Sequence, residues 1–335
     1  MIGGTGFIGP HAVRRMAGAG HEVMVFHRGE HEPELPSTVR HVHSPSAATP
    51  VLDFPTELRD FAPEVVLHMM LLGEQDARAV MDAFSGHARR LVAISSADTY
   101  RAYDILRGKE MRSPDPVPLG EDAPLREQLY PYRGMIEQLG DYDKILAERI
   151  VMSDPDLPGT ILRLPFVYGP DDRQHRFFPY LKRMDDGRAA ILLGERQARW
   201  CSSWGYVENV GAAIALACTD DRATGRIYNV AEELAPATQD WVRRIGDLAG
   251  WSGSVIPVPE SNLPSRLDRD YNWDQHLVLD TQCIRRELGY SEPVSVQEAV
   301  EQTVAWERAH PPEEVNPQGF DYEAEDAALA ATGTV

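Results

Sequence analysis

The 335-residue sequence has few cysteines, few lysines and no long apolar run. Its three cysteines are widely spaced and form no C-x-x-C pair, which argues against a disulfide framework and favours reduced thiols in the cytoplasm. No apolar segment approaches the ~18 residues that a membrane-spanning helix needs. The sequence also lacks clustered Lys and Arg, and its net charge is −19, so neither nucleic acid nor an anionic membrane is an expected partner.

What the sequence does contain is a glycine-rich turn near its beginning, in MIGGTGFIGP. Glycines three residues apart, followed by a helical segment and the apolar run 23–26, are typical of half a βαβ unit. Such glycines permit a tight turn and close backbone approach to a pyrophosphate, and the helix N-terminus offers free N–H groups to the phosphates. The pattern predicts a dinucleotide site that consists of Gly3, Thr5, Gly6, Phe7, Ile8 and Gly9.

The strand that should precede this turn is reduced to Met1 and Ile2. In the predicted architecture this strand lies in the middle of the sheet, and strands usually have about five residues. We therefore expect either a natural start a few codons upstream of Met1 or an unusually short first strand.

The end of the next strand indicates which dinucleotide to expect. An acidic residue about 20 residues beyond the glycines normally binds the ribose hydroxyls of NAD, but His27 and Arg28 occupy this place. A guanidinium suits a 2′-phosphate, so NADP is favoured as the cofactor. NAD is the alternative, in which Arg28 is a solvated turn residue and Glu30 binds the ribose.

Short apolar runs alternate with helical segments through much of the remaining sequence. Continuous apolar strands between helices predict an α/β fold with a Rossmann-type, doubly wound parallel sheet covered on both faces. The expected strands are 64–70, 90–96, 159–169 and 225–231, and the expected helices include 76–84, 207–218 and 296–310.

Several motifs occur in an order that resembles one family. GGTGFIG, ISSADTY, K-x-x-A-E, LRLPFVYGP, YVENVGAAIALA and RIYNV resemble the extended short-chain dehydrogenase/reductases, the group that contains the NAD-dependent epimerases and dehydratases. The resemblance runs from Gly3 to about Trp306. It implies Pro165 and Val167 as further cofactor contacts, a small-molecule substrate and a homodimer.

The resemblance also implies how the chain is divided. A smaller C-terminal substrate-binding lobe is expected beside the dinucleotide-binding domain, and the acidic tail is expected to be partly disordered or docked. The expected domain covers 1–169 plus 205–231, the lobe covers 170–204 plus 232–312, and the tail covers 313–335.

The catalytic set implied by the resemblance contains Ser96 and Lys144. The Ser96 hydroxyl would hydrogen-bond a substrate oxygen, although a serine at this place can also simply cap a turn. Lys144 would bind the cofactor ribose and lower the pKa of a tyrosine four residues before it. Gly140 occupies that position. Tyr142 is nearby, but side chains at i and i+2 of a helix point apart.

Two routes would bring a tyrosine into the site. A helix irregularity could turn Tyr142 toward the lysine, or Tyr130 or Tyr132 could reach in from the preceding loop. Asp98 is a candidate replacement acid/base, because a carboxylate in a partly desolvated cleft can have its pKa raised toward neutrality. The alternative reading is that Asp98 caps a turn.

The sequence thus predicts an NAD(P)-dependent oxidoreductase, epimerase or dehydratase with altered acid/base machinery. Its substrate would be a small polar metabolite, a sugar or a natural-product intermediate. Ser202 stands where nucleotide-sugar members of the family carry an arginine, so a smaller metabolite fits at least as well. No metal site is expected, because His41 and His43 have no convincing third ligand nearby in the sequence. The alternative function is a catalytically inactive NAD(P)-binding sensor or scaffold.

Overall fold

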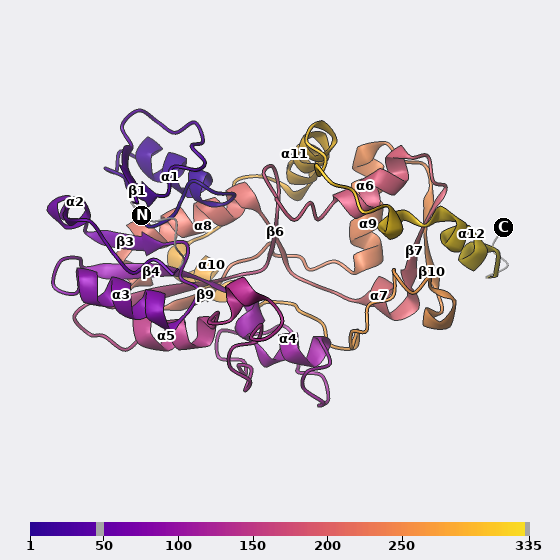
Figure 1. The fold of residues 1–335 in the computed structure, drawn as a ribbon, viewed down its shortest axis with the longest axis horizontal. Helices are drawn as coiled ribbons and strands as arrows, with labels where there is room; N and C mark the ends of the chain where they lie inside the picture. The colour runs from indigo at the N-terminus through magenta and orange to yellow at the C-terminus, as the bar shows by residue number, and fades with distance from the viewer. Residues whose placement is uncertain (45–49, 332–335) are drawn as a thin grey trace.

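The structure is a computed structural model that describes residues 1–44 and 50–331. A parallel sheet occupies one half of the elongated molecule (Figure 1). Its strands are β1 (Met24–His27), β2 (Arg40–His43), β3 (Val65–His68), β4 (Arg90–Ser96), β5 (Gly159–Leu164) and β9 (Ile227–Asn229). β1 pairs with β2, and β3, β4, β5 and β9 pair in that order. Ile2 bridges Phe26 of β1 and His68 of β3, and so joins both groups into one sheet.

Helices cover both faces of this sheet (Figure 1). On one face lie α1 (Gly9–Gly18) and α8 (Val207–Thr219), and on the other lie α3 (Glu74–Phe84) and α5 (Lys144–Val151). Successive strand residues point to opposite faces, so Val92 is buried among residues of α1 and α8, whereas Leu91 is buried among residues of α3 and α5. The predicted α/β fold class, a doubly wound parallel sheet, is confirmed.

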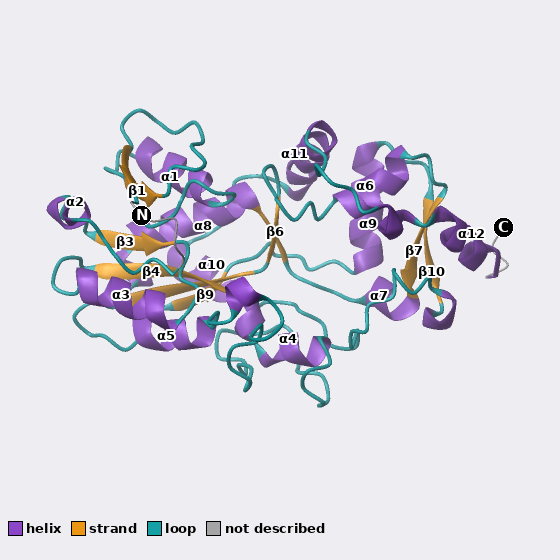
Figure 2. Ribbon diagram, viewed as in Figure 1, coloured by secondary structure: helices purple, strands orange, loops and turns teal. Residues whose placement is uncertain are grey.

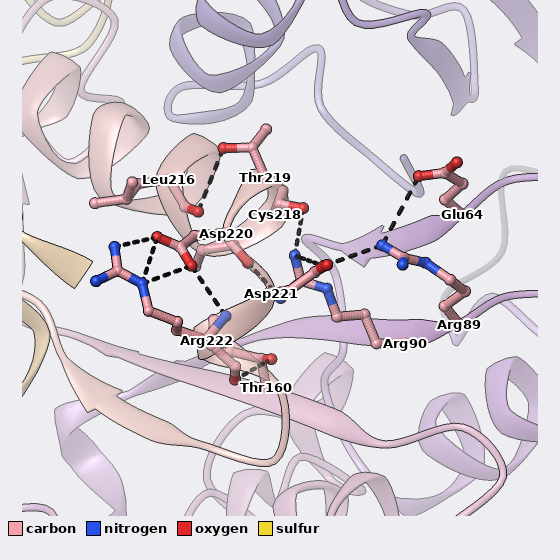
Figure 3. Close-up of polar contacts among 12 residues, drawn as sticks. Glu64, Arg89, Arg90, Thr160, Leu216, Cys218, Thr219, Asp220, Asp221 and Arg222 are labelled. Atoms are coloured by element: carbon pink, nitrogen blue, oxygen red, sulfur yellow. Dashed lines mark hydrogen bonds and ion pairs between the residues drawn. The ribbon is translucent and has the colours of Figure 1, made fainter. Parts of the chain in front are cut away.

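Arg90 ties the end of α8 to the start of β4 (Figure 3). Its buried guanidinium donates hydrogen bonds to the carbonyl oxygens of Ala217 (2.9 Å) and Cys218 (2.6 Å). The last carbonyls of a helix have no partner within the helix, and they form the negative end of its dipole. Arg90 therefore satisfies these carbonyls and fixes α8 against the sheet.

A pocket of about 460 Å³ lies where the first strand of the sheet is short. It is lined by Val23, which precedes β1, by Val65 of β3 and by Met1. The Met1 ammonium is buried and donates a hydrogen bond to the carbonyl oxygen of Met24 (2.7 Å). Burial lowers the pKa of this ammonium to about 6. Within the described residues, the first strand consists of the single bridging residue Ile2.

The other half of the molecule contains a two-stranded parallel sheet of β7 (Ala190–Gly194) and β10 (Ser254–Val258). Around it lie α6 (Phe178–Asp185), α7 (Glu195–Arg199), α9 (Thr238–Ala249) and α12 (Tyr322–Ala331) (Figure 1). β6 (Phe166–Tyr168) and β8 (Trp204–Tyr206) form a further parallel pair. The remaining helices are α2 (Thr56–Asp60), α4 (Arg101–Leu106), α10 (Gln282–Leu288) and α11 (Val296–Ala309).

The acidic tail is docked as far as α12. Glu325 of α12 is buried, and its carboxylate pairs with the buried guanidinium of Arg183 in α6 (Nη2 to Oε1, 2.6 Å). Within the described ranges, no helix has both the length and the apolar character needed to cross a bilayer.

Three strand predictions need correction. The sequence predicts one strand over 159–169, but Pro165 separates β5 from β6, because proline has no N–H to donate to a strand ladder. The strands expected at 64–70 and 225–231 exist, but both are shorter at each end than predicted.

Candidate active site

The N-terminal glycine turn is as tight as a dinucleotide site requires. Gly3 and Gly4 have positive φ angles of 72° and 120°. A Cβ atom on Gly9 would lie 2.3 Å from the Cα atom of Gly4, so only glycine lets α1 approach the turn this closely. Gly6 is exposed at the N-terminal end of α1, and Thr5, Phe7 and Ile8 are half-buried. The turn therefore fits a diphosphate group.

His27 and Arg28 lie at the carboxyl end of β1, as the sequence predicts. His27 is buried, whereas the Arg28 side chain is 47% exposed and lies 3.1 Å from the carboxylate of Glu30. Arg28, which suits a 2′-phosphate, and Glu30, which suits ribose hydroxyls, therefore lie at the same edge of the sheet.

Two other expected cofactor contacts lie near the break between β5 and β6. Pro165 is half-buried and occupies the break itself, and Val167 is buried in the core. A cofactor would therefore meet the backbone of Val167 rather than its side chain.

Helix α5 begins at Lys144, which overturns one expectation from the sequence. Asp143 caps the helix: its Oδ1 accepts hydrogen bonds from the N–H groups of Ile145 (2.9 Å) and Leu146 (3.2 Å). Gly140 instead ends a short 3-10 turn. The expectation that Tyr142 and Lys144 point apart as residues i and i+2 of one helix is therefore wrong, because Tyr142 lies outside α5.

Lys144 is buried at the carboxyl ends of the strands. Its Nζ donates hydrogen bonds to the carbonyl oxygens of Ile94 (2.9 Å) and Leu71. Burial lowers the pKa of Lys144 to about 8, and the negative charge of Asp98 acts in the opposite direction. A lysine with this pKa is still mostly an ammonium at neutral pH.

Asp98 accepts hydrogen bonds from the hydroxyls of two tyrosines. Tyr142 donates a hydrogen bond to its Oδ2 at 2.8 Å, and Tyr132 donates to the same atom at 3.2 Å. Oδ1 is buried and has no hydrogen-bond partner among the described residues. The Tyr142 ring centroid is 5.8 Å from Nζ of Lys144. Asp98, Tyr132, Tyr142 and Lys144 therefore form one cluster.

The two phenols of this cluster stay protonated. Burial, reinforced by the negative charge of Asp98, raises the pKa of Tyr142 and the pKa of Tyr132 well above the usual value of 10. In the mechanism implied by the resemblance, a lysine lowers the pKa of a tyrosine. Here burial and Asp98 raise the pKa of both tyrosines instead of lowering it. The atom in this cluster that is free to accept a proton is Oδ1 of Asp98.

Ser96 contacts Asp98 through the backbone. Its Oγ accepts a hydrogen bond from the N–H of Asp98 (3.2 Å) and caps the 3-10 turn Ala97–Thr99. Capping does not prevent the hydroxyl from donating to a substrate, so Ser96 remains a candidate for that role.

The sequence did not predict that Tyr142 contacts Asp98, nor the contacts that fix the loop before α5. Residues 107–143, which connect α4 to α5, are mostly loop (Figure 2). The N–H of Asp143 donates to the carbonyl oxygen of Leu72 (2.9 Å), and a Cβ atom on Gly73 would lie 2.4 Å from the carbonyl oxygen of Asp141. One signal was available, because an aspartate directly before Lys144 is a strong N-cap candidate that predicts a helix start after Tyr142.

Comparison with known proteins places the chain in a family. The sequence profile of the NAD dependent epimerase/dehydratase family matches residues 1–231. The protein y4nL of Sinorhizobium fredii is 23% identical over 191 residues, which cover 49% of this chain and 52% of y4nL. The chain thus spans about half the length of the curated relatives that it matches.

Two solved structures have a similar fold. An epimerase from Methanothermobacter thermautotrophicus has a TM-score of 0.64 at 18% identity, covering 92% of this chain and 91% of the other. The Bordetella bronchiseptica enzyme WbmG, in complex with NAD and UDP, has a TM-score of 0.64 at 18% identity, covering 92% and 94%. Similarity at this identity shows the fold alone. Because the profile covers well over half of the sequence, the chain belongs to the NAD dependent epimerase/dehydratase family.

Proposed function

We propose that the protein is an NAD(P)-dependent enzyme of the oxidoreductase, epimerase or dehydratase type. Its substrate would be a small metabolite with a reactive hydroxyl group, such as a sugar or a natural-product intermediate. The observation that carries this proposal is the cluster of Asp98, Tyr142 and Lys144. It lies at the carboxyl ends of the parallel strands, which is where doubly wound sheets bind their ligands.

The glycine turn and Lys144 would hold a nicotinamide dinucleotide, whose nicotinamide ring supplies hydride chemistry. The chain supplies the proton transfer. Oδ1 of Asp98 accepts a proton from the substrate hydroxyl, while the hydroxyls of Tyr142 and Tyr132 stabilise the charge on Oδ2.

An enzyme explains the cluster better than a sensor does. Leaving a buried acceptor without a hydrogen bond costs about 1–3 kcal/mol, and Oδ1 of Asp98 has no partner among the described residues. Dinucleotide binding alone gives no reason to keep such a group. A proton acceptor that is completed only by the substrate does give one.

The test compares two buried aspartates that each have an unpartnered oxygen within the described part of the chain, Asp98 and Asp104. Turnover of a panel of sugars and nucleotide sugars is followed by the absorbance of NAD(P)H, and dinucleotide binding is followed by calorimetry. We expect Asp98→Asn to lower turnover by about 100- to 10,000-fold and to leave dinucleotide binding nearly unchanged. Asp104→Asn should leave both unchanged. Tight dinucleotide binding without turnover of any substrate would favour the sensor.

We further propose NADP as the cofactor. Arg28 supports this choice, because its half-exposed guanidinium lies at the end of β1. Arg28→Ala should weaken NADPH binding by about tenfold or more and leave NADH binding unchanged, since only NADPH offers a phosphate there. Arg40→Ala, which removes another exposed arginine from the neighbouring strand, is the control. Tighter binding of NADH than of NADPH by the unaltered protein would assign NAD instead.

A further inference from the structure

Three histidines and a glutamate meet at the carboxyl ends of β1 and β2. His41 and His43 share one face of β2, because alternate residues of a strand point the same way. The register of the two strands places His27 beside His43. The centroid of the His27 ring is 5.1 Å from that of His41 and 4.8 Å from that of His43. Strand pairing therefore brings the three imidazole rings together, which a single strand could not achieve.

The possible ligand atoms are already close together. Nε2 of His27 is 2.9 Å from Nδ1 of His41, and Nε2 of His43 is 2.7 Å from Oε1 of Glu32. One such atom each from His27, Glu32 and His41 lies within 4.8 Å of the others. Two nitrogens that bind zinc tetrahedrally at 2.0–2.1 Å are about 3.3 Å apart. An ion would need His27 and His41 to separate by less than about half an ångström.

A metal ion binds the neutral form of the imidazole ring. Ligation through Nε2 of His27 moves the ring proton to Nδ1, which now accepts a 3.2 Å hydrogen bond from the N–H of Gly29. This hydrogen bond and the 2.9 Å hydrogen bond between His27 and His41 would be lost. Bonds from the ring nitrogens to the metal would take their place.

We propose that His27, His41, His43 and Glu32 form a zinc site. Imidazole with one carboxylate is a donor set that suits Zn²⁺. His27, His41 and Glu32 are the three mutually close ligands, and His43 would be the fourth, because its Nε2 lies 2.7 Å from Oε1 of Glu32. Glu32 lies between the two strands in sequence, so an ion here fastens edge strand β2 and the connecting segment to β1. The sequence offers His41 and His43 no third ligand nearby, whereas strand pairing and the connecting segment supply two.

The experiment uses the full chain after dialysis against a chelator and needs no cofactor or substrate. Titration with Co²⁺ should give the visible absorption of tetrahedral cobalt at one ion per chain, and Zn²⁺ should displace it. Zn²⁺ should also raise the melting temperature. His41→Gln and His43→Gln should each weaken Co²⁺ binding by more than about tenfold. Both side chains are exposed, so these variants should fold normally.

His31→Gln and His21→Gln are matched controls, because both histidines are exposed and lie outside the cluster. Neither substitution should change metal binding. The proposal is overturned if the unaltered chain takes up no Co²⁺, or if uptake survives both His41→Gln and His43→Gln.

Discussion

The hydroxyl of Tyr142 lies 2.8 Å from Oδ2 of Asp98, although Asp98 directly follows β4 and Tyr142 lies in the connection from α4 to α5. Tyr142 can make this contact because α5 begins two residues after it, at Lys144. The position four residues before the lysine is therefore not where this fold presents its tyrosine. In the proposed enzyme, the proton-accepting group is a carboxylate supported by phenols.

Tyr142→Phe should reduce turnover by about tenfold or more, because a hydrogen bond to a charged group contributes about 1.5–3 kcal/mol. The expected loss is in kcat, with dinucleotide affinity unchanged. Tyr180→Phe, at a half-buried tyrosine of α6, is the control. An equal loss of dinucleotide affinity in Tyr142→Phe would show that Tyr142 serves binding rather than proton transfer.

Lys144 should make the stability of the fold depend on pH. Burial lowers its pKa from 10.5 to about 8. Between these values the unfolded chain holds a proton on this lysine that the folded chain has lost, so the contribution of Lys144 to the free energy of unfolding rises with pH. The rise is about 3 kcal/mol across the window.

Urea unfolding of the unaltered protein and of Lys144→Met, at pH values across this window, measures that contribution. The difference in unfolding free energy between the two proteins should shift by about 3 kcal/mol in favour of the unaltered protein as pH rises. Lys182→Met, at a partly exposed lysine that pairs with Asp186, is the control. A constant difference in the Lys144→Met comparison would mean that Lys144 has an ordinary pKa.

Gly9→Ala should abolish dinucleotide binding, since the added Cβ would lie 2.3 Å from Gly4 and would open the turn. Gly18→Ala is the matched control in the same helix, where a Cβ meets no described atom within 4 Å apart from its chain neighbours and the backbone of its own helix. It should retain binding and stabilise the helix by up to about 1 kcal/mol. Calorimetry with NADPH and NADH measures binding. Normal affinity in Gly9→Ala would exclude the glycine turn as the diphosphate site.

Asp143→Ala should destabilise the fold by about 3–5 kcal/mol, because it leaves the guanidinium of Arg126 buried without its partner. The neighbouring Asp141 pairs with Arg133 at the surface, and Asp141→Ala should cost less than about 1 kcal/mol. Denaturant unfolding measures both changes. Similar small losses in the two variants would show that the buried pair does not hold the start of α5.

Added strand residues should fill the pocket beside Ile2. An engineered extension of three β-branched residues before Met1 would turn the buried ammonium into a peptide N–H and could pair with β1 and β3. We expect the melting temperature to rise. An extension of the same length made of glycine and serine should give a smaller rise. Equal effects of the two extensions would mean that the added residues stay outside the pocket.

The sequence predicted best what depends on local pattern. The glycine turn, the parallel strands and the helices α3, α8 and α11 follow from residue spacing, and the structure has them within a few residues. The family was predicted from ordered motifs and is confirmed.

Contacts across the fold could not be predicted in the same way. Tyr132 and Tyr142 reach Asp98 through a long connection whose conformation depends on tertiary contacts, such as the hydrogen bond from Asp143 to Leu72. The helix start at Lys144 was misjudged because the family spacing was given more weight than the N-cap at Asp143. His27 and His41 are fourteen residues apart and meet only because β1 and β2 pair.

Lys144 lies in helix α5, which packs against the sheet, whereas Tyr132 and Tyr142 lie in the connection before that helix. Evolution could therefore exchange one segment and leave the other intact. Grafting residues 107–143 from a relative would be a direct way to alter substrate choice or proton chemistry while retaining the dinucleotide platform.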